Sequence, residues 1–395
     1  MLLQTYVKTA NIGGIIKIYK LKKRYFKMPI TAPNKKNKQE ESHNKHEELT
    51  NEIYKNSGML PSRYVYILTN KCNLNCSFCF MKKQSVENPM TAKDWISLTD
   101  QLPDYAKVTI TGGEPFLFPR FKEVFSHVAS RFNCSIISNG TLLTEELSDF
   151  LLSHNNFKVL SISVDNIGNT LRNINSSIWK KTEEQIKYFR KKRNELNSGC
   201  VLDLKTTVLD DNAEDLFEIH KYCVETLGCD THVFQFLKGS PIQHADVLYD
   251  FDDILKKSNA EVYKKFDIIK DQFEKIKKYN LKTGAIAFLH PKVGSLIFEE
   301  IPINIDLMNQ TDYIRQNFKP CKYAWSSMHV NVDGAIFPCL AIQIGNIKEN
   351  TLKEIMSGER IKNFHDLIRK QGTIEACNRC GWLKPANINI EGKNY

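Results

Sequence analysis

Three cysteines that could bind a metal lie within eight residues of one another, at Cys72, Cys76 and Cys79. Thiolates are soft ligands that select zinc, copper(I) or an iron–sulfur cluster over hard cations. No further Cys or His stands close by in the sequence to complete a site with four ligands. Three ligands leave one coordination position open, and an open position is where a metal centre does chemistry. The spacing therefore predicts a reactive metal centre.

A second set of four cysteines has a different character: Cys321, Cys339, Cys377 and Cys380. Four thiolates complete a cubane iron–sulfur cluster with no open iron, which suits electron transfer or a structural role. A zinc ion with four cysteine ligands is the alternative. The remaining cysteines have no ligand spacing and are expected to be buried free thiols, unless Cys200 or Cys229 faces a cavity: Cys134, Cys200, Cys223 and Cys229.

The charge of the chain says little about its partner. The formal net charge is +10, but residues 1–38 hold ten Lys or Arg and no acid, so the rest of the chain is balanced. We therefore expect no nucleic-acid partner and a basic, flexible extension over residues 1–60. A basic segment that touches an anionic membrane or RNA is the alternative. No apolar run is long enough for a membrane span, and no secretory signal is present, so we expect a cytoplasmic protein.

From Arg63 onward, short apolar runs alternate with amphipathic stretches. The runs rich in Val, Ile, Tyr and Phe are expected to be strands: Arg63–Leu68, Lys107–Thr111, Cys134–Ser138, Val159–Val164, Val201–Val208 and His232–Phe236. Helices are expected between them, at Thr91–Gln101, Arg120–Arg131, Leu143–Ser153, Trp179–Asn194 and Asn212–Leu227. This alternation predicts an α/β fold with parallel strands and right-handed crossovers, either a partial barrel or an open wound sheet.

The alternation stops after Pro241. Residues 246–320 are expected to form a helical connection, whose helix has an apolar face that docks on the core or on a partner: Val262, Phe266, Ile269, Phe273 and Ile276. Residues 321–395 are expected to form a small unit. It begins with a hairpin, His329–Val332 and Ala335–Phe337 around Asp333-Gly334, and continues with a helix at Leu352–Lys370.

The order of the motifs resembles the radical S-adenosylmethionine (SAM) superfamily. The cysteine loop follows the first strand, Phe78 precedes its third cysteine, and Thr111-Gly112-Gly113-Glu114-Pro115 ends the second strand. Ile137-Ser138-Asn139-Gly140 and Ile162-Ser163-Val164-Asp165 match at the third and fourth strands. The resemblance covers roughly Arg63 to Gly239 and implies a partial (β/α)6 TIM-like barrel as the core, over residues 61–245. A zinc site would not explain the second motif.

The resemblance also implies cofactors and their ligands. Cys72, Cys76 and Cys79 would hold a [4Fe–4S] cluster whose open iron binds SAM, and one electron would cleave SAM to a 5′-deoxyadenosyl radical that abstracts a substrate hydrogen. The residues implied around SAM are Phe78, Gly112, Gly113, Glu114, Ser138, Ser163, Asp165 and Arg172. The family often has Gly where this chain has Asn166. Because Asn tolerates the left-handed backbone, we expect the turn to survive.

The four later cysteines resemble those of the SPASM and twitch extensions, which carry auxiliary [4Fe–4S] clusters. No cysteine follows Cys380, so we expect one auxiliary cluster. The main hypothesis for function is oxidation or rearrangement of a sugar-like small molecule, with flavodoxin or ferredoxin as the electron donor. A maturase that modifies a peptide is the alternative, and it is disfavoured because the segment before Arg63 is too short and polar for a winged-helix domain. A non-enzymatic iron–sulfur or zinc protein is the third hypothesis.

Overall fold

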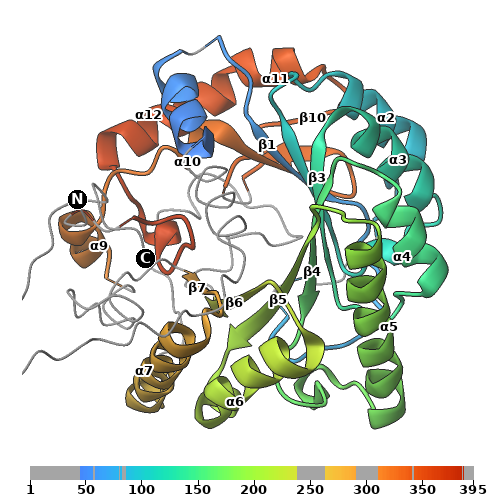
Figure 1. Cartoon of the computed structure of the whole chain (residues 1–395). Helices are drawn as coiled ribbons and strands as arrows, with labels where there is room; N and C mark the ends of the chain where they lie inside the picture. Colours follow the sequence, from blue (N-terminus) through green and yellow to red (C-terminus); the bar gives the residue numbers. More distant parts are fainter. Residues whose placement is uncertain are drawn as a thin grey trace, which may run out of the picture. The chain divides into compact units, whose positions relative to one another are not determined.

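The computed structural model describes residues 45–56, 58–79, 81, 86–237, 263–290, 310–339, 342–384 and 386 (Figure 1). All of them belong to one compact unit, Glu41–Tyr395. Most of the predicted N-terminal extension and part of the predicted helical connection lie outside the described residues, as does Val262.

Parallel strands form the central sheet, in the chain order expected for a partial barrel. The strands β1 to β7 lie side by side in sequence order. Their bounds are Arg63–Ile67, Lys107–Thr111, Asn133–Ser138, Phe157–Ser163, Val201–Val208, Thr231–Phe236 and Ala287–His290. The first six confirm the predicted strands to within two residues. The seventh was not predicted, because four residues with only Leu289 buried are too short to show a period.

Helices line the outer side of this sheet (Figure 1). Their bounds are α2 Ala92–Asp100, α3 Phe121–Arg131, α4 Glu145–Leu152, α5 Ser176–Glu195, α6 Leu216–Lys221 and α7 Phe266–Thr283. Thr91 and Asp94 start α2 with a reciprocal capping box, which satisfies free N–H groups at the beginning of the helix. Ile269, Phe273 and Ile276 of α7 are buried in the main core, which confirms that this face docks on the domain itself.

The single helix predicted over Asn212–Leu227 is wrong, because the structure divides this segment into three. Instead of one helix over Asn212–Leu227, a 3-10 turn over Asp210–Asp215 precedes α6, and a π-helical turn over Tyr222–Leu227 follows it. Asn212 explains the irregular start, because its side chain bonds to the chain around it. Its Oδ1 accepts from Leu209 N at 2.9 Å, and its Nδ2 donates to Asp165 O at 2.8 Å. The start of this segment is thus tied to the end of β4.

The C-terminal part continues the same sheet. β8 (Ser327–Val330) pairs in parallel with β1, and β9 (Ala335–Phe337) pairs antiparallel with β8. β10 (Gly345–Asn346) completes this edge of the ten-stranded sheet. Gly334 takes a positive φ of 88° in the turn, which confirms the predicted hairpin. The two cysteine sets are therefore joined by one hydrogen-bonded sheet.

Four helices accompany these last strands: α9 Thr311–Asn317, α10 Tyr323–Ser326, α11 Leu352–Ser357 and α12 Glu359–Gln371. The single helix predicted over Leu352–Lys370 is therefore wrong, because Gly358 separates α11 from α12. Gly358 has an extended conformation, with φ −69° and ψ 166°. Glycine is a poor helix former, and here it ends one helix and begins the next.

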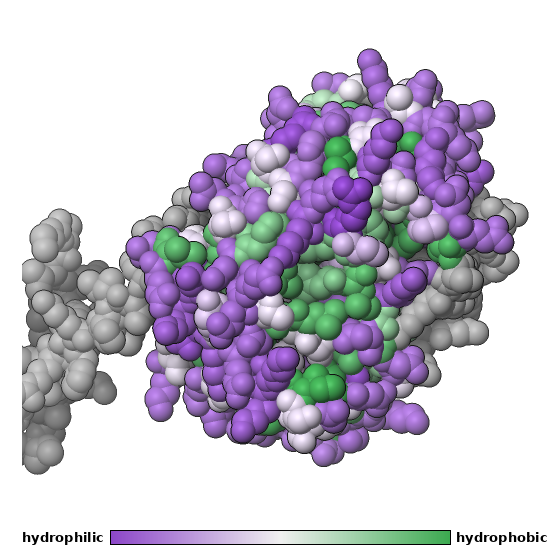
Figure 2. Space-filling view, turned by 90° about the vertical axis from the view of Figure 1, so that its right-hand side faces the viewer, coloured by the Kyte–Doolittle hydropathy of each residue, from purple (hydrophilic) through white to green (hydrophobic). Residues whose placement is uncertain are grey.

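Residues 45–55, within the predicted extension, are helical and packed against the C-terminal part. Ile53 is buried, Thr50 Oγ1 lies 2.9 Å from Ser326 Oγ, and Lys322 Nζ donates to Asn51 Oδ1 at 2.7 Å. The face in Figure 2 is largely hydrophilic, with apolar side chains gathered near its middle. In the described part of the chain no helix is long and apolar enough to cross a membrane.

Candidate active site at the carboxyl edge of the sheet

The first cysteine loop leaves β1 at the carboxyl edge of the sheet, where parallel folds bind small molecules. Cys72 and Cys76 are half-buried, and Cys79 is exposed. Burial raises the pKa of the Cys76 thiol, Arg172 opposes this, and the nearby Cys79 and Cys72 add to the rise. The structure thus carries all three predicted cluster ligands on one loop at the carboxyl edge of the sheet.

Two glycines press the end of β2 against the start of this loop. Gly113 N donates to Thr69 O at 2.7 Å, and Glu114 N donates to Lys71 O at 2.9 Å. A Cβ on Gly112 would lie 2.3 Å from Thr69 O, and a Cβ on Gly113 would lie 2.3 Å from Lys71 O. Real Cβ atoms do not come so close, so these positions require glycine. The two glycines therefore allow the end of β2 to contact the backbone of the cysteine loop.

Glu114 joins the end of β2 to the end of β3. Its carboxylate is fully buried and accepts from Ser138 Oγ at 2.9 Å, from Asn139 N at 2.8 Å and from Phe116 N at 3.3 Å. Burial raises the pKa of Glu114 to about 7, although the three hydrogen bonds oppose the rise. Two residues that the resemblance placed around SAM, Glu114 and Ser138, are thus bonded to each other.

Asn139 contacts the cysteine loop directly, although it was not among the predicted site residues. Its Nδ2 lies 3.8 Å from Cys72 Sγ and 3.0 Å from Asn73 Oδ1. Asn73 in turn donates to Thr141 Oγ1 at 2.8 Å. The signal was present in the Ser138-Asn139-Gly140 match, but an Asn before Gly reads as an ordinary turn residue.

Arg172 lies between the cysteine loop and the end of β4. Its Nε forms an ion pair with the fully buried Asp165, and its Nη1 lies 4.0 Å from Cys76 Sγ. The guanidinium also stands 5.5 Å from the centre of the Phe78 ring. The other oxygen of Asp165 accepts from Thr207 N at 2.5 Å. The structure therefore brings together Phe78, Asp165, Arg172 and Cys76.

The turn after β4 survives the replacement of Gly by Asn166, though not through a left-handed Asn166. The left-handed residues are Gly168, at φ 80°, and Asn169, at φ 52°. Asn169 closes the turn with its side chain, since its Nδ2 donates to Ser163 O at 3.0 Å and its Oδ1 accepts from Asp165 N at 2.9 Å. Asn166 accepts from Leu171 N at 3.0 Å. Ser163 and Asp165 are thus held by the turn that follows them.

The four later cysteines converge from three separate parts of the C-terminal region. Cys321 precedes α10, Cys339 follows β9, and Cys377 and Cys380 follow α12. Burial raises the pKa of Cys321 to about 12, with Cys380 adding to it. The pKa of Cys339 is also raised, first by burial and then by the other three thiols of this set. Each thiol therefore lies within electrostatic reach of the others.

Among the described residues, neither set of thiols is gathered as tightly as the ligands of a single bound metal ion. Zinc holds its sulfur ligands at about 2.3 Å from one point, which demands a tight group. Among the described residues, no three His, Cys, Asp or Glu side chains stand close enough to hold a single metal ion. A cubane is a larger body and spaces its thiolates further apart. Cys134, Cys200 and Cys223 are buried free thiols, and Cys229 is partly buried.

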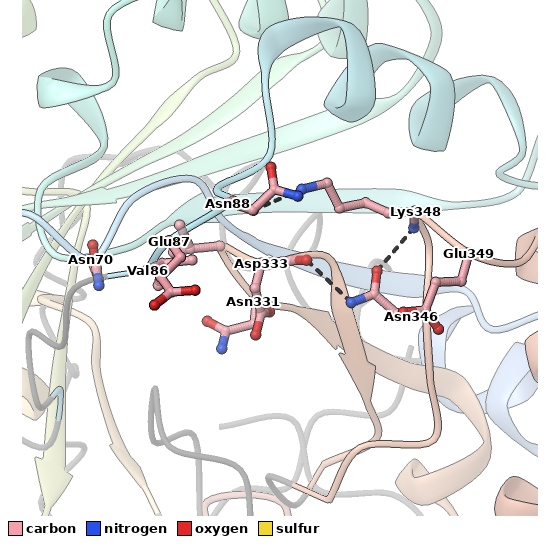
Figure 3. Close-up of a pocket in the computed structure, with 10 residues that line it drawn as sticks. Asn70, Val86, Glu87, Asn88, Asn331, Asp333, Asn346, Lys348 and Glu349 are labelled. Atoms are coloured by element: carbon pink, nitrogen blue, oxygen red, sulfur yellow. Dashed lines mark hydrogen bonds between the residues drawn. The ribbon is translucent and has the colours of Figure 1, made fainter.

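A polar cavity of about 570 Å³ lies between the first loop and the C-terminal hairpin (Figure 3). Asn70 follows β1, and Asn331 and Asp333 follow β8, so both sides of the cavity belong to the same edge of the sheet. Lys348 spans its rim by donating from Nζ to Asn88 O at 2.7 Å. Glu87 and Glu349 complete an acidic and amide-rich lining. Its position makes it a candidate substrate cavity.

Two segments match known families. Residues 66–223 match the Radical SAM superfamily, and residues 321–381 match SPASM, an iron–sulfur cluster-binding domain. The sporulation killing factor maturation protein SkfB of Bacillus subtilis is 26% identical over 76% of this chain and 66% of its own length. The tungsten-containing aldehyde ferredoxin oxidoreductase cofactor-modifying protein of Pyrococcus furiosus is 27% identical over 84% of this chain and 92% of its own length.

Solved structures share the fold. Streptococcus suis SuiB bound to the precursor peptide SuiA has a TM-score of 0.56 at 17% identity, over 88% of this chain and 74% of that one. Native anSMEcpe with bound AdoMet has a TM-score of 0.53 at 17% identity, over 82% and 89%. The cofactors are a [4Fe–4S] cluster with SAM for the first region and auxiliary iron–sulfur binding for the second. The chain belongs to the radical SAM superfamily as an enzyme with a C-terminal SPASM iron–sulfur domain.

Proposed function

We propose that this enzyme modifies a peptide, by abstracting a hydrogen atom from one of its residues. The observation that carries the proposal is the similarity to SkfB, named a maturation protein, over 76% of this chain. The likeness to SuiB, solved with the precursor peptide SuiA, extends over 88% of the chain and supports a fold compatible with peptide binding. The alternative of the sequence analysis is thus better supported than its main hypothesis.

Oxidation or rearrangement of a small molecule is the second candidate. It is favoured by the similarity to the cofactor-modifying protein of Pyrococcus furiosus, which extends over nearly the whole of that relative. The sequence argument against a peptide substrate rested on the segment before Arg63. Residues 1–44 of that segment lie outside the described residues. Nothing in the described structure therefore disfavours a peptide substrate on that ground.

The first loop is proposed to hold the SAM-binding cluster through Cys72, Cys76 and Cys79. A reduced cluster with SAM supplies a 5′-deoxyadenosyl radical as the hydrogen-abstracting species. The chain's own residues hold the loop in place: Gly112 and Gly113 allow the backbone contact beneath it. Arg172 stands beside Cys76 with its charge balanced by Asp165, and it is proposed to face the carboxylate of SAM.

The remaining residues that were predicted around SAM are proposed to frame its site. Phe78 stands beneath the guanidinium of Arg172. Glu114 and Ser138 link β2 to β3, and the turn after β4 holds Ser163. Residues 61–245 are proposed to form the core that binds SAM, and residues 321–395 are proposed to form the domain that holds the auxiliary cluster.

The C-terminal cysteines are proposed to hold one auxiliary cluster that transfers electrons. The influence of the other three thiols on the pKa of Cys339 supports this proposal, and a closed cluster would leave no iron open for substrate. Flavodoxin or ferredoxin is the proposed electron donor. The cavity between the loop and the hairpin offers amides and carboxylates, which suit the hydrogen-bonding groups of a peptide backbone.

The decisive experiment is anaerobic. The cluster-loaded enzyme is incubated with SAM, a strong reductant and short peptides encoded beside its gene, and both 5′-deoxyadenosine and peptide mass are followed. We expect a peptide of changed mass together with 5′-deoxyadenosine, and neither from the Cys76→Ala variant. If 5′-deoxyadenosine forms while every peptide keeps its mass, and a sugar or cofactor precursor is converted instead, the peptide assignment is wrong.

A further inference from the structure

Cys72 receives two N–H groups, one from its own loop and one from the next strand's end. Leu74 N lies 3.4 Å from Cys72 Sγ, and Asn139 Nδ2 lies 3.8 Å from the same sulfur. The first bond comes from the local backbone and forms in any loop of this shape. The second crosses from the end of β3 and depends on one side chain.

The amide of Asn139 is held in a single orientation. Its Oδ1 accepts from Thr141 N at 2.9 Å and from Thr141 Oγ1 at 2.6 Å. A backbone N–H can only donate, so it fixes the oxygen on that side and leaves Nδ2 toward the sulfur. The backbone of Asn139 is fixed as well, because its N–H donates to the buried Glu114 carboxylate at 2.8 Å. Only 5% of Asn139 is exposed.

Such a donor changes the chemistry of the sulfur it faces. Reduction of an iron–sulfur cluster places more negative charge on its sulfurs, so an N–H that donates to a ligand sulfur stabilises the reduced form. Hydrogen bonds to the sulfurs are one of the levers by which proteins set cluster potentials. Because the site is partly buried, water does not readily replace a lost donor.

We propose that Asn139 is a positioning residue of the SAM-binding cluster, which holds Cys72 through an N–H···S hydrogen bond and raises the cluster's midpoint potential. The proposal concerns the cluster and is independent of the substrate class. The hydrogen bond from Asn139 to Cys72 also links the cysteine loop to Glu114, because the backbone N–H of Asn139 donates to the Glu114 carboxylate. The ends of β2 and β3 therefore hold the loop from two sides.

The test compares Asn139→Asp and Asn139→Ala with Asn73→Ala. The Asp variant keeps an acceptor for Thr141 but removes the donor from Cys72. Asn73→Ala serves as the matched control, because it removes the bonds from Asn139 Nδ2 and to Thr141 Oγ1 and leaves the N–H···S bond in place. The full-length, reconstituted proteins are titrated potentiometrically with detection by electron paramagnetic resonance. The relevant signal is the one that changes when SAM is added.

We expect both Asn139 variants to titrate at a more negative potential than the wild type, and Asn73→Ala to titrate like the wild type. A tenfold weaker preference for the reduced state corresponds to a shift of about 59 mV for one electron. Selective loss of the SAM-sensitive signal in both Asn139 variants, with normal circular dichroism, would also support a positioning role. Unchanged potentials in the Asn139 variants, or an equal shift in Asn73→Ala, would overturn the proposal.

Discussion

Arg172 and Asp165 form a buried ion pair whose guanidinium also faces Cys76, a proposed cluster ligand. Asp165 is fully buried, the Arg172 side chain is 15% exposed, and Nη1 of Arg172 lies 4.0 Å from Cys76 Sγ. The Arg172 guanidinium therefore stands between the Asp165 carboxylate and the Cys76 sulfur at the carboxyl edge of β4. Removal of this ion pair should therefore lower the free energy of unfolding by a measurable amount.

Replacing Arg172 by Gln should destabilise the protein, because it leaves the Asp165 carboxylate buried without its counter-charge. Removing one partner of a buried pair typically costs about 3–5 kcal/mol. We expect a loss near the lower end, about 3 kcal/mol, because Thr207 N still donates to Asp165. Urea unfolding of the metal-free protein, followed by circular dichroism, measures it.

Arg120→Gln is the matched control for this prediction. Its ion pair with Glu123 is solvent-exposed, with side-chain exposures of 67% and 37%. Exposed pairs contribute about 0–1 kcal/mol, so this variant should unfold close to the wild type. If Arg172→Gln unfolded at the same urea concentration as Arg120→Gln, the buried pair would contribute no more to stability than the exposed pair.

Replacing Gly113 by Ala should displace the cysteine loop. The added Cβ would lie 2.3 Å from Lys71 O, one residue before Cys72, so the backbone must shift. Overpacking of this kind typically costs about 1–3 kcal/mol. We expect less iron to be bound after reconstitution, together with this loss of stability. Iron analysis and urea unfolding on the same preparation check both expectations.

Gly199→Ala provides the comparison for the loop prediction. No atom lies within 4 Å of a Cβ at Gly199, and its φ is not in the left-handed region. This variant should bind iron like the wild type and should be equally or slightly more stable, by about 0.4–1 kcal/mol. Equal iron contents in the two variants would mean that the contact beneath the loop does not position the cysteines.

The sheet could be predicted because its signal is local. Val201–Val208 and Lys107–Thr111 match their predicted bounds, since their β-branched and apolar residues recur at the two-residue period of a strand. Two of the exceptions are also local in origin. β7 is too short to show a pattern, and Gly358 breaks a helix whose flanking residues continue the helical period.

The contacts within the site could be predicted only in part. The cysteine spacing predicts a metal centre from the sequence alone. The cysteines and the two glycines lie at the strand ends that the motifs indicate. Asn139 could not be identified, because its contact with Cys72 joins residues 67 positions apart. Nor does spacing reveal that β8 pairs with β1 and so connects the auxiliary domain to the barrel. Such long-range pairings depend on tertiary packing, which no window of sequence contains.

Glu114 should make stability depend on pH. Its folded pKa is raised to about 7 from an ordinary value of 4.5, with burial as the main cause. The folded state therefore binds this proton more tightly than the unfolded state. Stability from this group is greatest below pH 4.5, falls as pH rises from about 4.5 to about 7, and is constant above that. The change amounts to at most about 3 kcal/mol.

The variant Glu114→Gln isolates this effect, because every other group titrates alike in both proteins. The difference in unfolding free energy, wild type minus variant, should fall between pH 5 and pH 7 and then level off. Urea unfolding of the metal-free proteins at several pH values measures the difference. A difference that stayed flat across this range would mean that the Glu114 carboxyl keeps an ordinary pKa in the folded state.

The auxiliary site should be removable without loss of the first cluster. The double variant Cys377→Ala/Cys380→Ala leaves only Cys321 and Cys339, and two thiolates are too few to hold a cubane. We expect about eight irons per chain in the reconstituted wild type and about four in the variant. The electron paramagnetic resonance signal that responds to SAM should remain, because Cys72, Cys76 and Cys79 are untouched.

Metal analysis of the same two preparations separates iron from zinc at this site. The mirror variant Cys76→Ala/Cys79→Ala should also keep about four irons, but without a signal that responds to SAM. If instead the Cys377→Ala/Cys380→Ala variant lost one zinc and kept all its iron, the C-terminal site would be a zinc centre.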